Sequence, residues 1–176
     1  MCGICGLVGQ ANSEIIDTML KTIAHRGPDD SGIYVNETPN GDTVGLGHRR
    51  LSKIALSKAG HQPMSSLDGR IWLTFNGEIY NYLELRQELF SRGHRFRCNT
   101  DSEVIIAAYQ EWGEQCVIRF NGMFAFAIYD VSKNEVFAAR DQFGIKPFYY
   151  CKVTEGYLFS SEIKAFLKAS SFRALP

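Results

Sequence analysis

The spacing of apolar residues changes from that of a strand to that of a helix within the first 30 positions. Residues 4–8 form a short apolar run between glycines, which is typical of a buried strand. From Ser13, a candidate helix N-cap, apolar residues recur at helical spacing as far as Ile23, and Gly27-Pro28 ends the pattern. The chain is therefore predicted to begin with a buried strand followed by an amphipathic helix.

Two further helices are predicted in the middle of the chain. Asn81 and Glu84 form an N-cap signature ahead of apolar residues at helical spacing, and Gly93 is placed to end that helix. Thr100 and Glu103 repeat the signature for a second helix, whose apolar residues again stop before a glycine.

The remaining apolar segments read as strands. Residues 123–130 are apolar at nearly every position, so both faces of that strand must be covered. A short helix is expected over 162–168. The other predicted strands are 32–35, 43–47, 71–75, 136–139, 148–151 and 157–160. Many doubly buried strands and few helices predict two sheets stacked face to face with helices outside.

Composition narrows the class of partner. The 176 residues include 19 basic and 19 acidic side chains, and neither sign forms a long block, so no nucleic-acid or membrane-surface footprint is present. No apolar run approaches the roughly 20 residues that cross a bilayer, and the N-terminus lacks signal-peptide features. We therefore expect a cytoplasmic domain that binds a small molecule or another protein.

The five cysteines do not resemble a secreted disulfide framework. Cys2 and Cys5 have the spacing of a redox or zinc pair, but no second close pair exists and the four histidines fall at no ligand-like interval. We expect no metal site here. A dithiol or metal-binding module built on Cys2 and Cys5 stays open as an alternative.

Cys2 is the strongest candidate nucleophile. Removal of Met1 would leave a thiol with a reference pKa of about 8.5 beside an α-amine with a reference pKa of about 7.7 to 8.0. N-terminal nucleophiles activated by their own amine are an established arrangement. The plain alternative is a small buried residue at the start of a strand.

Polar clusters follow several predicted strands, where a rigid scaffold often presents binding groups. One is the glycine- and proline-containing stretch 26–32, which also reads as a structural turn. Another is 48–52, where the Arg50 fork suits a carboxylate, although a solvated basic turn is the plain alternative. Asn76 and Gly77 offer two N–H donors to a developing oxyanion, or else a hairpin turn.

Eight motifs, in register over nearly the whole chain, resemble the glutaminase domain of glutamine-dependent asparagine synthetases, which are class II amidotransferases. They are MCGICGLVG, RGPDDSG, HRRLS, NGEIYN, TDSEVI, GMFAFAIYD, RDQFGIKPFYY and SSEIKAF. The resemblance implies an N-terminal-nucleophile hydrolase fold of class α+β, a four-layer αββα sandwich with two stacked, mainly antiparallel sheets. It implies that residues 1–176 form one amidotransferase domain, truncated before a C-terminal ATP-dependent synthetase domain.

The resemblance also implies roles for individual residues. Cys2 falls on the nucleophile, and Asn76 with Gly77 on the oxyanion donors. Groups that bind glutamine fall on Arg50 for the α-carboxylate, on Asp101 and Glu78 for the α-ammonium, and on the backbone of Leu51, Ser52, Lys53 and Ile54. The sequence departs from the family at Arg49 and Lys53, where two extra positive charges flank Arg50.

The implied activity is hydrolysis of L-glutamine to glutamate and ammonia through a Cys2 thioester. The ammonia would feed ATP-dependent amidation of aspartate to asparagine, or of a related acceptor, in a synthetase domain or subunit. The resemblance implies no cofactor in this domain, ATP and Mg in the synthetase domain, and leaves a homodimer open. The alternative is a catalytically silent regulatory or interaction domain, which predicts no release of glutamate.

Overall fold

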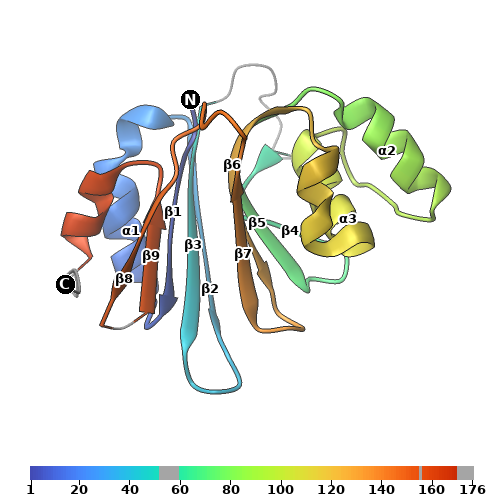
Figure 1. Ribbon diagram of the computed structural model, residues 1–176. Helices are drawn as coiled ribbons and strands as arrows, with labels where there is room; N and C mark the ends of the chain where they lie inside the picture. Colours follow the sequence, from blue (N-terminus) through green and yellow to red (C-terminus); the bar gives the residue numbers. More distant parts are fainter. Residues whose placement is uncertain (52–59, 155, 170–176) are drawn as a thin grey trace.

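The computed structural model describes residues 1–51, 60–154 and 156–169, and it shows two antiparallel sheets facing each other between outer layers of helix (Figure 1). Helix α1 (Ser13–Thr22) covers one sheet, while α2 (Tyr82–Ser91) and α3 (Asp101–Trp112) cover the other. The predicted α+β, four-layer αββα arrangement is confirmed.

The first sheet has five strands in the order β2-β3-β1-β9-β8. Gly3 pairs with Arg49, so the start of β1 lies beside the end of β3. The strands are β1 (Gly3–Gly9), β2 (Asp30–Glu37), β3 (Thr43–Arg50), β8 (Tyr149–Val153) and β9 (Gly156–Ser160).

The second sheet has four strands in the order β4-β5-β6-β7. They are β4 (Met64–Ser65), β5 (Ile71–Ile79), β6 (Gly122–Asp130) and β7 (Glu135–Arg140). β5 pairs with β6 along its whole length, but with β4 only at Trp72 and Leu73. Beyond Leu73, no strand within residues 1–51, 60–154 and 156–169 pairs with this edge of β5.

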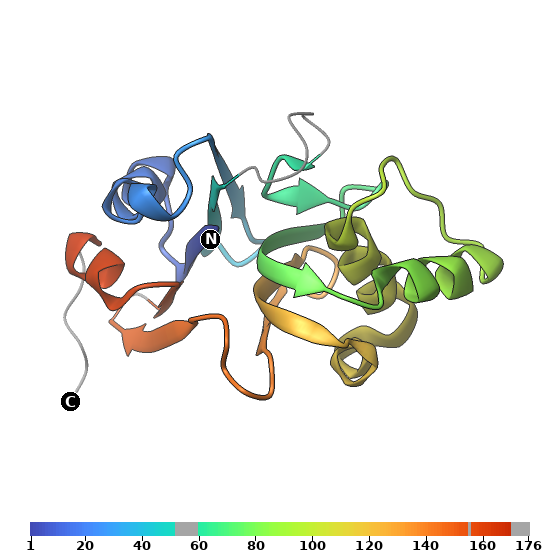
Figure 2. The ribbon, with the colours of Figure 1, turned by 90° about the horizontal axis from the view of Figure 1, so that it is seen from above.

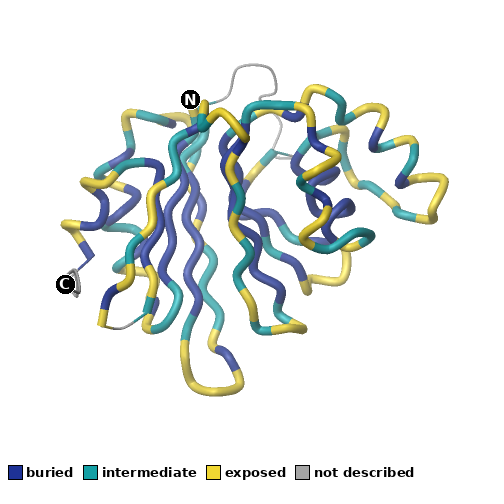
Figure 3. The backbone as a smooth tube through the Cα atoms, viewed as in Figure 1, coloured by how far each residue is buried: buried dark blue, intermediate teal, exposed yellow. Residues whose placement is uncertain are grey.

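Strand alternation divides the apolar residues among three cores. One lies beneath α2 and α3 and includes Leu73 and Phe75 of β5, and another lies beneath α1 and includes Cys5 and Leu7 of β1. A third, with Leu46, fills the space between the sheets. Burial accordingly follows the strands of both sheets (Figure 3).

Two strands continue beyond their predicted ends into the polar clusters. β3 continues from the predicted end at Gly47 to Arg50, and β5 continues from Phe75 to Ile79. The polar clusters at these positions therefore lie in strands rather than in turns. Strand pairing, which the local sequence does not reveal, holds them extended: Arg50 pairs with Asp30, and residues 76–79 pair with β6.

Helix caps confirm one prediction and correct others. The Thr100 side chain caps α3 by accepting from Glu103 N, as predicted. The cap of α1 is Asn12 rather than Ser13, because the Asn12 side chain accepts from Ile15 N at 2.8 Å. Asn81 precedes α2 but makes no side-chain cap, and it bonds instead to the backbone of residues 119 and 121.

Short 3₁₀ helices complete the fold. They are η1 (Ala24–Arg26), η3 (Gly113–Arg119) and η4 (Ile163–Lys168), and η4 replaces the helix predicted over 162–168. Within residues 1–51, 60–154 and 156–169, the helices are too short or too polar to cross a bilayer.

Candidate active site

The start of β1 and the ends of β3 and β5 lie at one end of the two sheets. The Thr74 hydroxyl of β5 donates to the Gly47 carbonyl at 3.0 Å, and the His48 ring lies 3.1 Å from the Phe75 carbonyl oxygen. β3 and β5 therefore run in the same direction. Viewed from above, the N-terminus lies beside β3 on this end of the fold (Figure 2).

Cys2 immediately precedes β1 and is half-buried. Its carbonyl oxygen accepts from Arg26 Nε at 3.0 Å, and Arg26 Nη1 also bonds Glu162 at 3.1 Å. Burial opposes ionisation of Glu162, but hydrogen bonds from Lys164, Arg26 and His25 lower its pKa below the usual value. The backbone of Cys2 is thus anchored through an arginine to η1 and, across the sheet, to the segment after β9.

The Asn76 side chain points between the two sheets. Thr74, two residues earlier on β5, contacts β3, and alternation gives Asn76 the same face, whereas Phe75 packs beneath the helices. Asn76 is only 2% exposed, and its Nδ2 meets no hydrogen-bond partner among the described residues. Buried donors are nearly always paired, so this one requires an explanation.

The Gly77 N–H lies on the unpaired edge of β5. Odd-numbered residues of β5 turn their backbone groups to that edge: Phe75 N donates to Gln62 Oε1 at 2.7 Å, and Ile79 N donates to Asp101 Oδ2 at 3.2 Å. Gly77 lies between them. A Cβ at Gly77 would come within 2.3 Å of the Met123 carbonyl oxygen, so β6 leaves room only for glycine.

Arg50 ends β3 on the face shared with His48, which is turned toward the second sheet. Gly60 packs against its guanidinium, because a Cβ there would lie 2.5 Å from Nη2. Asp30 pairs with Arg50 across β2 and β3. Burial works against ionisation of Asp30, yet hydrogen bonds from His61 and Ser31 and the Arg50 charge lower its pKa.

Alternation places Arg49 on the opposite face of β3 from Arg50, the face on which Gly45 and Gly47 pack against α1. Its positive charge therefore does not extend the Arg50 surface. Leu51 follows directly and is half-buried. The other predicted members of this segment, Ser52, Lys53 and Ile54, lie outside the described residues.

Asp101 is the first residue of α3 and holds the end of β5 through the Ile79 N–H. Burial raises the pKa of its carboxyl, the Ile79 and Ser102 N–H groups oppose this, and the nearby negative charge of Glu78 adds to it. Glu78 itself is exposed. Two carboxylates close to each other favour a cation between them.

Cys5 does not accompany Cys2 as a second reactive thiol. Its side chain is 0% exposed and packs in the core beneath α1, where burial raises the pKa of the thiol. In the part of the chain that the structure describes, no three His, Cys, Asp or Glu side chains gather as metal ligands. The geometry therefore gives no support to the dithiol or metal-binding alternative.

Three residues at this end were not predicted from the sequence. Arg26 and His48 stand inside motifs that attracted attention, but nothing in their spacing shows that one binds the Cys2 carbonyl and the other the Phe75 carbonyl. Gln62 gave no signal, since its role depends on β4 beginning only at Met64.

Comparisons with known proteins agree on the family. A family model described as a glutamine amidotransferase domain matches residues 1–175. Glutamine-hydrolysing asparagine synthetases 3 and 1 of Bacillus subtilis are 41% and 40% identical, over 99% and 96% of this chain but 28% and 27% of their own length. Amidase chry2 of Gibberella zeae is 36% identical over 95% of this chain and 26% of its own. The chain thus spans about a quarter of these relatives.

A solved structure shares the fold. The glutamine phosphoribosylpyrophosphate amidotransferase of Bacillus subtilis, solved with ADP and GMP, matches with a TM-score of 0.79 at 22% identity, over 99% of this chain and 45% of the other. At that identity the match supports the architecture of the two sheets and their helices.

Proposed function

This chain belongs to the class II glutamine amidotransferase family, and we propose that it hydrolyses L-glutamine to glutamate and ammonia through a thioester on Cys2. The observation that carries the proposal is the buried Asn76 amide nitrogen, which has no partner among the described residues and lies beside the Gly77 N–H at the end of the sheets where Cys2 begins. Two fixed donors of this kind suit an oxygen that becomes negative when a carbonyl is attacked.

The first half of the reaction forms the thioester. Removal of Met1 frees the Cys2 α-amine, which accepts the thiol proton while the sulfur attacks the side-chain amide carbon of glutamine. Asn76 Nδ2 and the Gly77 N–H donate to the resulting oxyanion. The Cys2 α-ammonium then protonates the departing nitrogen and the C–N bond breaks. Ammonia departs, and a γ-glutamyl thioester remains on Cys2.

The second half releases glutamate. The α-amine, now neutral again, accepts a proton from water as the water oxygen attacks the thioester carbon. The same two donors hold the second oxyanion. Collapse breaks the C–S bond, the sulfur regains its proton, and glutamate departs with no net change in the protein.

We propose that the amino-acid end of glutamine is held by charges at the same end of the fold. Arg50 binds the α-carboxylate through two parallel hydrogen bonds, and Asp101 with Glu78 binds the α-ammonium. Backbone groups of residues 51–54 complete the site. Leaving a half-buried charge without its partner is costly, so glutamine analogues that lack either α-group should be rejected strongly.

The relatives are named for asparagine synthesis and extend well beyond the matched region. We propose that residues 1–176 are the glutaminase domain of such an enzyme, working in the cytoplasm and supplying ammonia to a synthetase domain or subunit that amidates aspartate or a related acceptor. ATP and Mg belong to that partner, and the steps derived for this domain use only its own side chains and backbone. Light scattering on the same preparation would test for a homodimer.

The test uses protein whose loss of Met1 is verified by intact mass. Incubation with glutamine should release glutamate and ammonia in equal amounts, and an electrophilic glutamine mimic should add one covalent adduct on Cys2. Uncleaved protein that retains Met1 is the matched control and should do neither. Absence of glutamate release from correctly processed protein would overturn the proposal in favour of a silent regulatory or interaction domain.

A further inference from the structure

Beyond its pairing with β4, the end of β5 is held by side chains, since no further strand among the described residues pairs with that edge. β4 pairs with β5 through Met64 and Leu73, and continuing that register would bring Gln62 opposite Phe75. β4 begins only at Met64. In place of a backbone carbonyl, the Gln62 side chain accepts the Phe75 N–H through Oε1 at 2.7 Å, and Gln62 is itself buried.

His48 hydrogen-bonds the other backbone group of Phe75, its carbonyl oxygen. Its Nε2 lies 3.1 Å from the Phe75 carbonyl oxygen, and because a carbonyl only accepts, the proton must be on Nε2. The ring is 1% exposed, and burial lowers the pKa of His48 to about 4 even though the bond to Phe75 opposes this change. At neutral pH the ring is therefore an uncharged donor with a defined tautomer.

Gln62 connects Phe75 of β5 to the start of α3, where Asp101 lies. Its Nε2 donates to the Ser102 hydroxyl at 3.3 Å, and Ser102 follows Asp101 on α3. Asp101 in turn accepts the Ile79 N–H. Side chains from β3, from the residue before Pro63 and from α3 thus hold Phe75 and Ile79, two residues on either side of Gly77.

This arrangement differs from a full strand in one respect. A paired strand would take up the N–H groups of residues 75, 77 and 79 alike. The side chains take up those of Phe75 and Ile79 and so fix the backbone, whereas no side chain of the described residues bonds the Gly77 N–H between them.

We propose that His48 and Gln62 are positioning residues that fix the Phe75–Gly77 segment, so that Asn76 and Gly77 present their donors in a single geometry. The proposal rests on the glutaminase function proposed above. It predicts that loss of either contact slows steps that build an oxyanion, and leaves glutamine binding through Arg50 largely unchanged.

The test compares near-isosteric substitutions that differ in hydrogen bonding. His48→Gln keeps an N–H donor on a long side chain, and His48→Met removes it; Gln62→Met removes both contacts of Gln62. We expect kcat for glutamate release to fall roughly 10- to 100-fold in the Met variants, since loss of a whole oxyanion donor costs about 10²- to 10³-fold. KM for glutamine should change less than about threefold, and His48→Gln should recover most of kcat.

A second readout separates positioning from general damage. Alkylation of Cys2 by a glutamine analogue carrying a halide on a saturated carbon builds no oxyanion, so its rate should change little in the Met variants. His94→Gln, a substitution in the connection between α2 and α3, serves as the histidine control and should leave both rates unchanged. If the Met variants fold poorly, Ser102→Ala loosens Gln62 more gently and should lower kcat a few-fold.

The outcomes are distinguishable. Wild-type protein that neither releases glutamate nor is alkylated would defeat the proposed function. An active wild type with equally active Met variants would defeat the positioning role alone. Parallel losses in kcat and alkylation rate, without recovery in His48→Gln, would assign His48 a merely structural role.

Discussion

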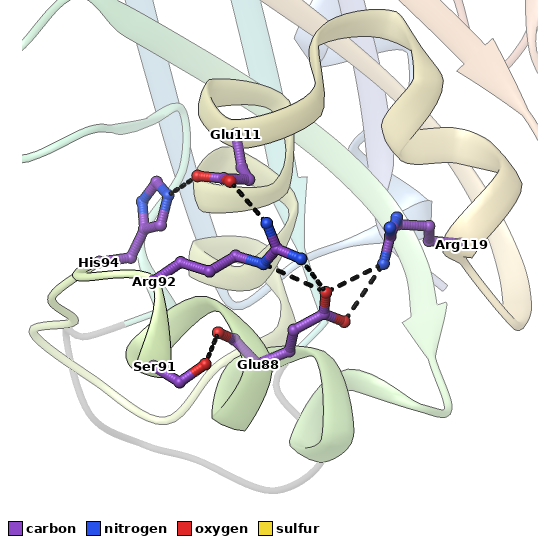
Figure 4. A network of polar contacts seen from close by, with 6 residues as sticks. All are labelled: Glu88, Ser91, Arg92, His94, Glu111 and Arg119. Atoms are coloured by element: carbon purple, nitrogen blue, oxygen red, sulfur yellow. Dashed lines mark hydrogen bonds and ion pairs between the residues drawn. The ribbon is translucent and has the colours of Figure 1, made fainter.

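The polar groups at the candidate site contrast with those that join α2, α3 and η3. In the network that joins α2, α3 and η3, Glu88 bonds Arg92 and Arg119, and Glu111 bonds Arg92 and His94, so each of these four acidic and basic partners is paired at least once (Figure 4). His94 is the fifth member and bonds Glu111. Glu88 and Arg92 are also 35% and 43% exposed. At the site, by contrast, the buried Asn76 amide nitrogen has no hydrogen-bond partner among the described residues.

Four buried side-chain atoms have no hydrogen-bond partner within the described residues, and of these Asn76 Nδ2 lies at the site. Those of Arg26 and Arg49 lie nearby, but Arg49 is on the opposite face of β3. Leaving a buried polar group unpaired costs about 1 to 3 kcal/mol, whereas an exposed ion pair contributes about 0 to 1 kcal/mol. The helix network therefore adds a little stability, and the site costs some, which is expected where a ligand completes the bonding.

Replacing Cys2 should have the largest effect. Cys2→Ala removes the only group proposed to form a covalent bond with glutamine, so glutamate release should fall below detection while the melting temperature stays near that of the wild type. A coupled assay for glutamate measures the activity, and thermal unfolding measures the stability. Residual turnover would mean that another nucleophile acts, and the contrast between the two regions would lose its functional meaning.

Asn76→Leu should separate activity from stability. The substitution keeps the approximate volume and removes a buried donor for which the described part of the chain supplies no partner. We expect kcat to drop about 10²- to 10³-fold, as when one oxyanion donor is lost, and the free energy of unfolding to be unchanged or higher. Steady-state kinetics and urea unfolding measure the two quantities. A marked loss of stability would show that Asn76 serves the fold instead.

Arg50→Lys should alter binding more than chemistry. Lysine keeps the positive charge but cannot make two parallel bonds to a carboxylate. KM for glutamine should rise by roughly 10-fold or more, corresponding to about 1.4 kcal/mol, with a smaller change in kcat. An unchanged KM would remove Arg50 from the substrate's α-carboxylate.

Some features of the fold and the candidate site can be predicted from the sequence, and others cannot. The layer order, the doubly buried β6 and the Thr100 cap follow from apolar spacing and local capping chemistry. The ends of β3 and β5 do not, because distant pairing extends them. Family motifs predict Cys2, Asn76 and Asp101 as site residues, but the contacts of Arg26, His48 and Gln62 join segments far apart in the chain and are seen only in the fold.

Acidification should destabilise the site end through His48. The folded-state pKa of about 4 lies below the ordinary value of 6.5, so the unfolded chain binds a proton first and stability is lost as pH falls from about 6.5 to 4. Between pH 7 and 5 this one group should cost about 2 kcal/mol. Urea unfolding at both pH values should show a smaller pH effect in His48→Gln, and an equal effect would place the titration elsewhere.

The smallest effect is expected in the outer helices. Glu88→Gln breaks the charge contacts with Arg92 and Arg119, both of which also pack over the Trp112 ring. Because the groups are exposed, the loss of stability should be below about 1 kcal/mol and should shrink further in 1 M salt. Glutamate release should be unchanged. Urea unfolding at low and high salt measures the loss, and the Glu88→Gln Arg119→Met double variant isolates the contribution of the Glu88–Arg119 pair. A drop in kcat would show that the helix layer and the site are coupled after all.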